Sequence, residues 1–205
     1  AIILWDVEKK TLLKTLTGHT GKILSVCFNA DGSQLASGSS DKTAKIWNVS
    51  TGQCEQTLAG HRYGILSVSF DSQGSLLATG SNDATARIWY LPTGKTRHVI
   101  QHRQPVDSVQ FSPRLALLAT GSGDGIIQLW STTQLRLLKT IESNQLAIRQ
   151  LQFHPNGMQL ASAGADSTVK LWQVPLGKRI RTYQGHLKPV RCLAFHPDGT
   201  ELVSA

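Results

Sequence analysis

Short runs in which apolar and polar residues alternate recur along the whole chain. Residues 23–28 form one such run, and a run of small residues follows at 35–38. Alternation with many β-branched residues is typical of strands. Turns such as Asp31-Gly32 and Asp198-Gly199 lie between the runs and favour tight hairpins. No segment has the period of an amphipathic helix, so the pattern predicts an all-β protein of short antiparallel strands.

Tryptophan marks a repeat along the chain. Successive tryptophans are 42, 42, 41 and 42 residues apart, at Trp5, Trp47, Trp89, Trp130 and Trp172. Each interval has room for four short strands. A period near 40 with four strands per unit predicts a β-propeller in which each repeat is one four-stranded antiparallel blade.

The repeat predicts about five units in the single domain 1–205. Residues 1–17 supply the last two strands of a divided repeat, and residues 185–205 supply its first two. The whole repeats cover residues 18–59, 60–101, 102–143 and 144–184. Two arrangements are open: a closed five-bladed ring, and a fragment of a longer propeller, which we favour. An open array would expose strand edges, and pairing between copies in a homo-oligomer could cover them.

Four polar residue types recur at fixed offsets in the whole repeats. The first three repeats keep His, Ser or Thr, Asp and Trp at offsets of 0, 18, 22 and 28: His19, Ser37, Asp41 and Trp47; His61, Thr79, Asp83 and Trp89; His102, Thr120, Asp124 and Trp130. With this spacing and the Trp5-Asp6 dipeptide, the sequence resembles the WD-repeat (WD40) propeller family over essentially the whole chain.

The resemblance implies that each set of four is a buried hydrogen-bonded tetrad. A buried indole, hydroxyl, imidazole and carboxylate each need a partner, and together they satisfy one another. The fourth repeat departs from the pattern, because the offsets give Asn144 in place of His, with Ser162, Asp166 and Trp172. The divided repeat offers His186, Ser204 and Trp5, without an Asp.

The same residue types also occur in hydrolase triads. Ser37, His19 and Asp41 would supply a nucleophile, a base and a carboxylate. A nucleophile must be exposed, however, and one triad per protein suffices, whereas this set repeats and includes a Trp. We therefore expect a structural role, no enzymatic activity, no catalytic residue, no cofactor and no metal site.

The resemblance also implies where partners bind. In this family the contact positions lie three and five residues after the tetrad His and one before the tetrad Asp. In this sequence they include Lys22, Leu24, Ser40, Gly64, Leu66, Asn82, Asp107, Arg149 and Arg191. Three are basic and Asp107 is the one acid. We expect a scaffold or adaptor of the signalling or assembly type that binds proteins or peptides, with acidic or phosphorylated segments as a hypothesis. The alternative is ordinary surface charge.

Composition adds a second functional hypothesis. The 21 basic and 13 acidic residues give a net charge of +8, so a nucleic-acid (RNA or DNA) binding module is the alternative to protein binding. No run approaches the roughly 18 apolar residues of a membrane helix, and we expect no membrane association. Three cysteines without C-x-x-C spacing indicate reduced thiols, which places the expected location in the cytoplasm, with the nucleus as the alternative.

Overall fold

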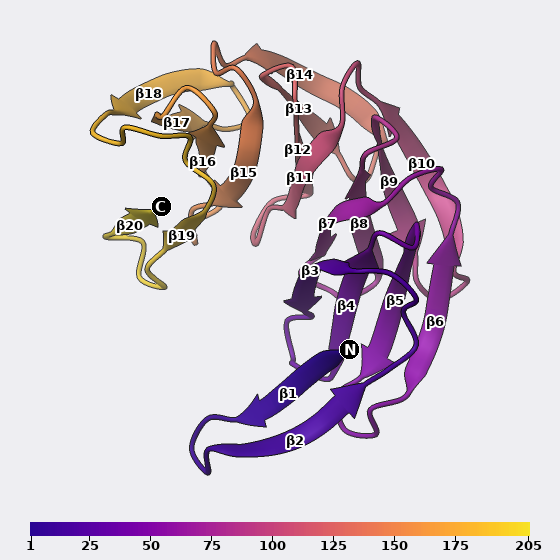
Figure 1. The fold of residues 1–205 in the computed structure, drawn as a ribbon. Coiled ribbons are helices and arrows are strands. Elements are labelled where there is room, and N and C mark those ends of the chain that lie inside the picture. Colours follow the sequence, from indigo (N-terminus) through magenta and orange to yellow (C-terminus); the bar gives the residue numbers. More distant parts are fainter.

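The computed structural model describes residues 1–205, which form twenty strands and no helix. The strands make four four-stranded antiparallel sheets and two two-stranded sheets (Figure 1). No helix is therefore available to cross a membrane. The prediction of an all-β chain built from four-stranded blades is confirmed.

Each whole sheet contains four strands in chain order, and we number these sheets blades 1 to 4. Blade 1 comprises β3 (Ile23–Phe28), β4 (Gln34–Ser39), β5 (Thr43–Asn48) and β6 (Cys54–Ala59). Blade 2 comprises β7 (Ile65–Phe70), β8 (Leu76–Ser81), β9 (Thr85–Tyr90) and β10 (Lys95–Gln101). Blade 3 comprises β11 (Val106–Phe111), β12 (Leu117–Ser122), β13 (Ile126–Ser131) and β14 (Arg136–Glu142). Blade 4 comprises β15 (Ile148–Phe153), β16 (Gln159–Gly164), β17 (Val169–Gln173) and β18 (Lys178–Tyr183).

The two remaining sheets are hairpins at the ends of the chain. The N-terminal hairpin is β1 (Ile2–Asp6) with β2 (Thr11–Leu16), and the C-terminal hairpin is β19 (Leu193–Phe195) with β20 (Leu202–Ser204). The blades form an arc with these hairpins at its two ends (Figure 1). Each hairpin pairs only with itself, so the closed five-bladed ring is not formed. The packing of neighbouring blades sets the curvature of the arc, and this curvature leaves the hairpins apart.

The apolar core lies between blades rather than within them. The largest cluster has 11 buried residues and joins blades 3 and 4, where Leu129, Ile148 and Trp172 pack together. Side-chain hydroxyls link the inner strands in the same register at successive interfaces. The backbone N–H of Val68 donates to Ser25 Oγ (3.2 Å), and that of Leu151 donates to Ser108 Oγ (3.0 Å). Neighbouring blades are thus held by apolar contacts and by repeated hydrogen bonds.

Every inner strand of a whole blade has a β-bulge near its start. The pairing register shifts after Ile23, Ile65, Val106 and Ile148. The residues left without a cross-strand partner are Leu24, Leu66, Asp107 and Arg149. Because a bulge re-aims a side chain, it gives one residue per blade a direction that the regular strand would not.

Candidate interaction face

The bulged residues meet at the centre of the arc. They line one hollow of about 370 Å³, and Arg191, which lies just before β19, joins them. The structure thus brings together five predicted partner positions, one from each of five successive repeats: Leu24, Leu66, Asp107, Arg149 and Arg191. We call the cavity that these five residues line the central hollow.

The other predicted positions form a rim next to the central hollow. Lys22 lies two residues before Leu24, and its carbonyl accepts the N–H of Ser40 (2.8 Å). In blade 2 the carbonyl of Gly64 accepts the N–H of Asn82 in the same way (3.0 Å). Equivalent bonds occur in blades 3 and 4, at Gly123–Pro105 and Ala165–Ala147. These residues do not line the hollow, but they sit at the same end of every blade.

Two residues of the central hollow form an ion pair between blades. Arg149 Nη1 lies 2.9 Å from Asp107 Oδ2, and their side chains are 47% and 17% exposed. Burial raises the pKa of Asp107, and the nearby Arg149 guanidinium opposes this effect. The two residues occupy equivalent positions in successive repeats, 42 residues apart. Their pairing was missed from the sequence, although this equivalence was the signal for it.

Lys22 and Arg191 make no ion pair, and both are exposed. Their position beside a pair that already neutralises Asp107 leaves two free cations on this face. The arrangement is suited to binding anionic groups by charge-assisted hydrogen bonds.

The tetrads of blades 1 and 2 are complete. In blade 1 the Trp47 indole donates to Ser37 Oγ (2.8 Å), the Ser37 hydroxyl donates to His19 Nε2 (2.7 Å), and His19 Nδ1 donates to Asp41 (2.7 Å). Blade 2 repeats the chain from Trp89 through Thr79 and His61 to Asp83, with distances of 2.9, 2.7 and 2.9 Å.

The charge state of the blade 2 tetrad follows from its burial and its hydrogen bonds. Burial alone would raise the pKa of Asp83, but bonds from Thr85, the Arg62 backbone and His61 lower it to about 2. Burial also lowers the pKa of His61. An ionised carboxylate therefore accepts from a neutral imidazole, which leaves Nε2 free to accept the hydroxyl of Thr79.

Blade 3 does not form the predicted tetrad. His102 Nε2 still accepts from Thr120 (2.8 Å), but His102 Nδ1 bonds to Ser122 Oγ (3.1 Å), and the Ser122 hydroxyl in turn donates to Asp124. The Trp130 indole donates to Gln128 Oε1 (3.0 Å) instead of Thr120. Ser122 is inserted between imidazole and carboxylate, and the prediction for Trp130 and Asp124 is wrong.

Blade 4 uses a different residue from the one predicted. The buried Gln145, and not Asn144, accepts the Ser162 hydroxyl (2.6 Å), while the Trp172 indole donates to Ser162 Oγ (2.9 Å). Asn144 has a left-handed backbone with φ of 54° and is exposed. Asp166 accepts the hydroxyl of Thr168 rather than an imidazole proton.

The divided repeat is not assembled within the chain. His186 Nε2 lies 2.8 Å from Ser204 Oγ, so half of a tetrad is present in the C-terminal hairpin. Trp5 is at the other end of the arc and is 60% exposed. The predicted set of His186, Ser204 and Trp5 is therefore split.

The tetrad hydroxyls cannot meet a substrate. Ser37, Thr79 and Ser162 have no exposed surface, and each accepts an indole N–H. A nucleophile needs access and a nearby oxyanion site, which a fully buried hydroxyl lacks. No group of three or more His, Cys, Asp or Glu residues could hold a metal ion.

Two family models match most of the chain. A model described as WD domain, G-beta repeat matches residues 10–48 and 52–90. A second, described as Anaphase-promoting complex subunit 4 WD40 domain, matches residues 109–198. The matched segments reach into all four blades, and they leave out β10 of blade 2 and the first residues of β11 in blade 3.

Curated relatives match over single repeats. Periodic tryptophan protein 2 homolog of Schizosaccharomyces pombe is 53% identical over 45 residues, which are 22% of this chain and 5% of that protein. Vegetative incompatibility protein HET-E-1 of Podospora anserina is 51% identical over 41 residues, which are 20% of this chain and 3% of that protein. The similarity therefore covers a small part of either relative.

Proposed function

Since the chain belongs to the WD-repeat family, we propose that it is a non-catalytic scaffold or adaptor that binds proteins or peptides at the central hollow and its rim. One observation carries this proposal: the bulges of successive inner strands direct one side chain each into a shared hollow. Acidic or phosphorylated segments are the partner class that we favour.

The charges on this face support that partner class. Arg191 and Lys22 are free of ion pairs, and the Arg149 side chain is half exposed even while it contacts Asp107. Arg binds carboxylate and phosphate groups through paired hydrogen bonds. Leu24 and Leu66 add an apolar side to the hollow, so an acidic segment with one apolar residue fits the lining.

A peptide-binding measurement tests the proposal. Fluorescent acidic and phosphoserine peptides are titrated with the native chain and with the double variant Arg149→Glu, Arg191→Glu. We expect this double variant to weaken peptide binding by about tenfold or more, which corresponds to a loss of about 1.4 kcal/mol or more in the free energy of binding. The control Lys95→Glu, Arg136→Glu changes the same charge on the exposed outer strands β10 and β14, and it should have little effect.

Equal weakening by both variants would contradict the proposed face, because it would show binding by net charge alone. If a single-stranded RNA bound more tightly than any peptide, with a steep loss of affinity in salt, the nucleic-acid alternative would replace it.

A reducing compartment, the cytoplasm or the nucleus, is part of the proposal. Cys27, Cys54 and Cys192 are all unpaired, which is typical of proteins kept in contact with thiol reductants.

A further inference from the structure

A second hollow, of about 440 Å³, lies between blades 2 and 3. It is lined by the turns that follow β7, β11 and β13 and by one residue of the outer strand β10. None of its residues lines the central hollow. Two arginines, Arg97 of blade 2 and Arg114 of blade 3, are among the lining residues, and we call this cavity the basic hollow.

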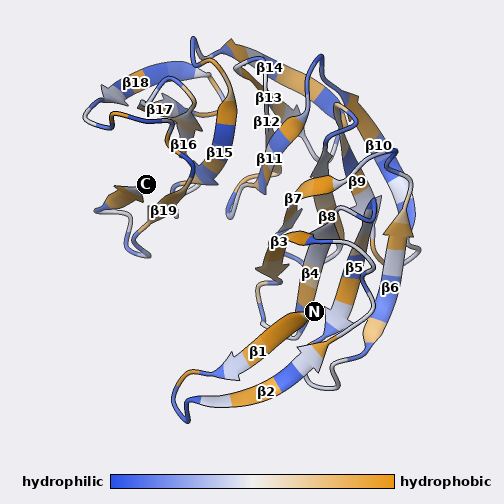
Figure 2. Ribbon diagram, viewed as in Figure 1, coloured by the Kyte–Doolittle hydropathy of each residue, from blue (hydrophilic) through white to orange (hydrophobic).

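Neither arginine of the basic hollow forms an ion pair. The outer strand β6 carries hydrophilic and hydrophobic residues in turn (Figure 2), and β10 follows the same plan, with Arg97 exposed and Ile100 buried. The Nε–H of Arg114 donates to the Pro155 carbonyl (3.1 Å), which leaves its two terminal nitrogens without a partner. Two cationic groups are therefore available to a ligand.

One acidic residue, Asp71, also lines the basic hollow. Its carboxylate accepts the backbone N–H of Leu76 (2.8 Å) and the hydroxyl of Ser75 (3.1 Å). Both carboxylate oxygens are therefore engaged within their own turn. Asp71 makes no ion pair with either arginine, so the two positive charges are not neutralised inside the protein.

The turn that carries Arg114 departs from the repeat. Leu115 stands where Gly74 and Gly157 turn the chain in blades 2 and 4, with φ of 69° and 73°. Blade 3 closes this turn with a side chain instead, because the buried Ser112 hydroxyl oxygen accepts the N–H groups of Arg114 (3.4 Å) and Leu115 (3.1 Å). The backbone of Arg114 is thus held in place beside the basic hollow.

Thr132 adds an unpaired hydroxyl to the basic hollow. It occupies the repeat position of Val49, Leu91 and Val174, which pack against the apolar core. Thr132 is only 8% exposed, and while its backbone N–H donates to the Ala116 carbonyl (3.0 Å), its hydroxyl has no hydrogen-bond partner. A hydroxyl in such a position costs free energy unless it is hydrogen-bonded, and a ligand in the hollow would supply the bond.

Arg97, Arg114 and Thr132 are combined at this interface alone. The residues at the same repeat positions in the two neighbouring interfaces are neither basic nor hydroxylic: Glu55, Gln73 and Leu91 between blades 1 and 2, and Leu138, Asn156 and Val174 between blades 3 and 4. The repeated architecture does not require these three residues, so their presence together points to a ligand.

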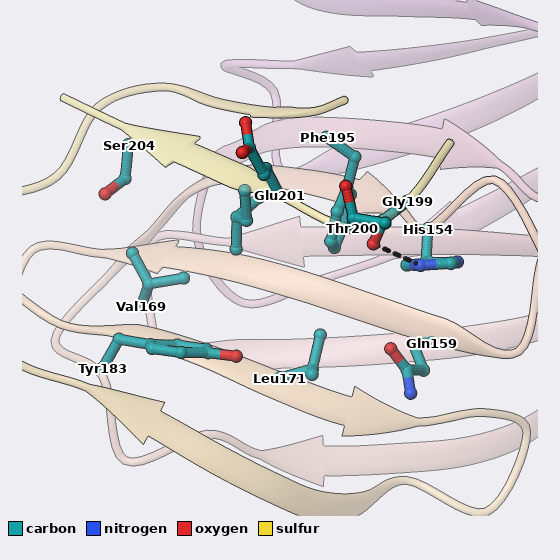
Figure 3. A pocket seen from close by; sticks show the side chains of 11 residues that line it. His154, Gln159, Val169, Leu171, Tyr183, Phe195, Gly199, Thr200, Glu201 and Ser204 are labelled. Atoms are coloured by element: carbon teal, nitrogen blue, oxygen red, sulfur yellow. Dashed lines mark hydrogen bonds between the residues drawn. The ribbon is translucent and has the colours of Figure 1, made fainter. Parts of the chain in front are cut away.

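A hollow between two sheets does not by itself have this character. Another hollow, of about 310 Å³, lies between blade 4 and the C-terminal hairpin. Figure 3 shows Val169, Leu171 and Phe195 in its walls together with the acidic Glu201, and no arginine or lysine lines it. The basic hollow differs from it through its cations.

We propose that the basic hollow binds the phosphate monoester of a small polyhydroxylated molecule, such as a sugar phosphate. Its volume lies within the roughly 300–1,000 Å³ of small-molecule sites. A phosphate monoester carries nearly two negative charges at neutral pH, which matches two unpaired arginines that can each donate several hydrogen bonds. Ser72, Gln73 and Thr132 line the same space and offer hydrogen-bonding groups to the hydroxyls of the ligand.

Nuclear magnetic resonance of the isotope-labelled native chain tests the site, because it detects weak binding residue by residue. Glucose-6-phosphate should shift the side-chain Nε–H signals of Arg97 and Arg114 and the backbone amide signal of Thr132 in one saturable titration. Glucose should leave these signals unchanged. Inorganic phosphate should shift the two arginine signals, but with a dissociation constant several-fold higher than that of glucose-6-phosphate.

Three variants separate the basic hollow from the net positive charge of the chain. Arg97→Gln should weaken the binding of glucose-6-phosphate by about tenfold, which is the effect expected for the loss of one charge-assisted contact. Thr132→Val should weaken it several-fold without destabilising the fold, since valine stands at that position in blades 1 and 4. The matched control Arg179→Gln removes the same charge from the exposed outer strand of blade 4, and it should bind like the native chain.

Equal weakening in Arg97→Gln and Arg179→Gln would overturn the proposal, and so would the absence of a saturable shift at Arg97 and Arg114. Inorganic phosphate that bound as tightly as glucose-6-phosphate would overturn the assignment of a polyhydroxylated ligand. A phosphoserine peptide that shifted the same signals at a lower concentration would replace the small molecule by a protein partner. All these outcomes are independent of the central hollow, whose test changes Arg149 and Arg191.

Discussion

The side-chain oxygen of Gln145 accepts the hydroxyl of Ser162 at 2.6 Å. A neutral amide thereby takes the place that an imidazole holds in blades 1 and 2. The amide nitrogen of Gln145 donates to the Thr168 carbonyl (3.0 Å), so both ends of the group are satisfied inside the blade. Blade 4 keeps a buried indole–hydroxyl–amide chain that has no titratable imidazole.

Gln145→Leu should lower the free energy of unfolding by about 1–3 kcal/mol, because it leaves the buried Ser162 hydroxyl without its acceptor. Asn144→Gly is the matched control, since glycine adopts the left-handed backbone found there (φ 54°) and the Asn144 side chain is exposed. Urea unfolding of both variants measures the difference. A larger loss in Asn144→Gly than in Gln145→Leu would return the tetrad role to Asn144.

The tryptophans of blades 1 and 3 should differ in their contribution to stability. Trp47 is 1% exposed and donates to Ser37, whereas Trp130 is partly exposed and donates to Gln128 on its own strand. Trp47→Phe should cost about 2 kcal/mol, through a cavity and the loss of the indole hydrogen bond to Ser37, and Trp130→Phe about 1 kcal/mol or less. Thermal unfolding compares the two. Equal losses would mean that the Trp130 indole does reach Thr120 in solution.

The architecture and two tetrads could be predicted because blades 1 and 2 repeat the same residues at the same offsets. The residue offsets did not predict the tetrad of blade 3, because a residue next to the tetrad changed its hydrogen bonds. Thr43 and Thr85 hold the tetrad carboxylates of blades 1 and 2, but Ile126 stands at that position in blade 3 and donates no hydroxyl. The Asp124 carboxylate accepts the hydroxyl of Ser122 instead.

The error at Asn144 has a different origin. Counting residues aligns Asn144 with the histidines but does not reveal that its backbone is left-handed. The longer side chain of Gln145 reaches Ser162 from the next position. The ion pair of Asp107 and Arg149 was missed because each repeat was considered by itself, although residues one repeat apart lie side by side in adjacent blades.

Stability should fall in mild acid because of the buried histidines. Burial lowers the pKa of His102 from 6.5 to about 4, and also lowers that of His61. The unfolded chain therefore binds protons first. The stabilisation by neutral imidazole is complete above pH 6.5 and is lost as the pH falls toward 4.

The expected loss from His102 over this range is about 3 kcal/mol, which corresponds to the shift in its pKa. Asp83, with a pKa of about 2, contributes to the pH dependence only below the ordinary value of 3.8, so the two effects are separable. Urea unfolding at a series of pH values measures the slope. His102→Gln should be less stable at pH 7 but should show a shallower fall, and an unchanged slope would remove His102 as the cause.

The ion pair in the central hollow should contribute little to stability. Arg149 is 47% exposed, and pairs of this kind are worth about 0.2–1 kcal/mol. A double-mutant cycle of Asp107→Ala and Arg149→Ala should give a coupling in that range, and it should shrink at high salt.

A weak pair leaves Arg149 free to exchange Asp107 for a ligand carboxylate or phosphate. Asp107→Asn should then strengthen the binding of acidic peptides several-fold without changing the free energy of unfolding by more than about 1 kcal/mol. A coupling of several kcal/mol would instead mean that Arg149 stays bound to Asp107 and holds blades 3 and 4 together. Arg191 and Lys22 would then be the cations available to a partner.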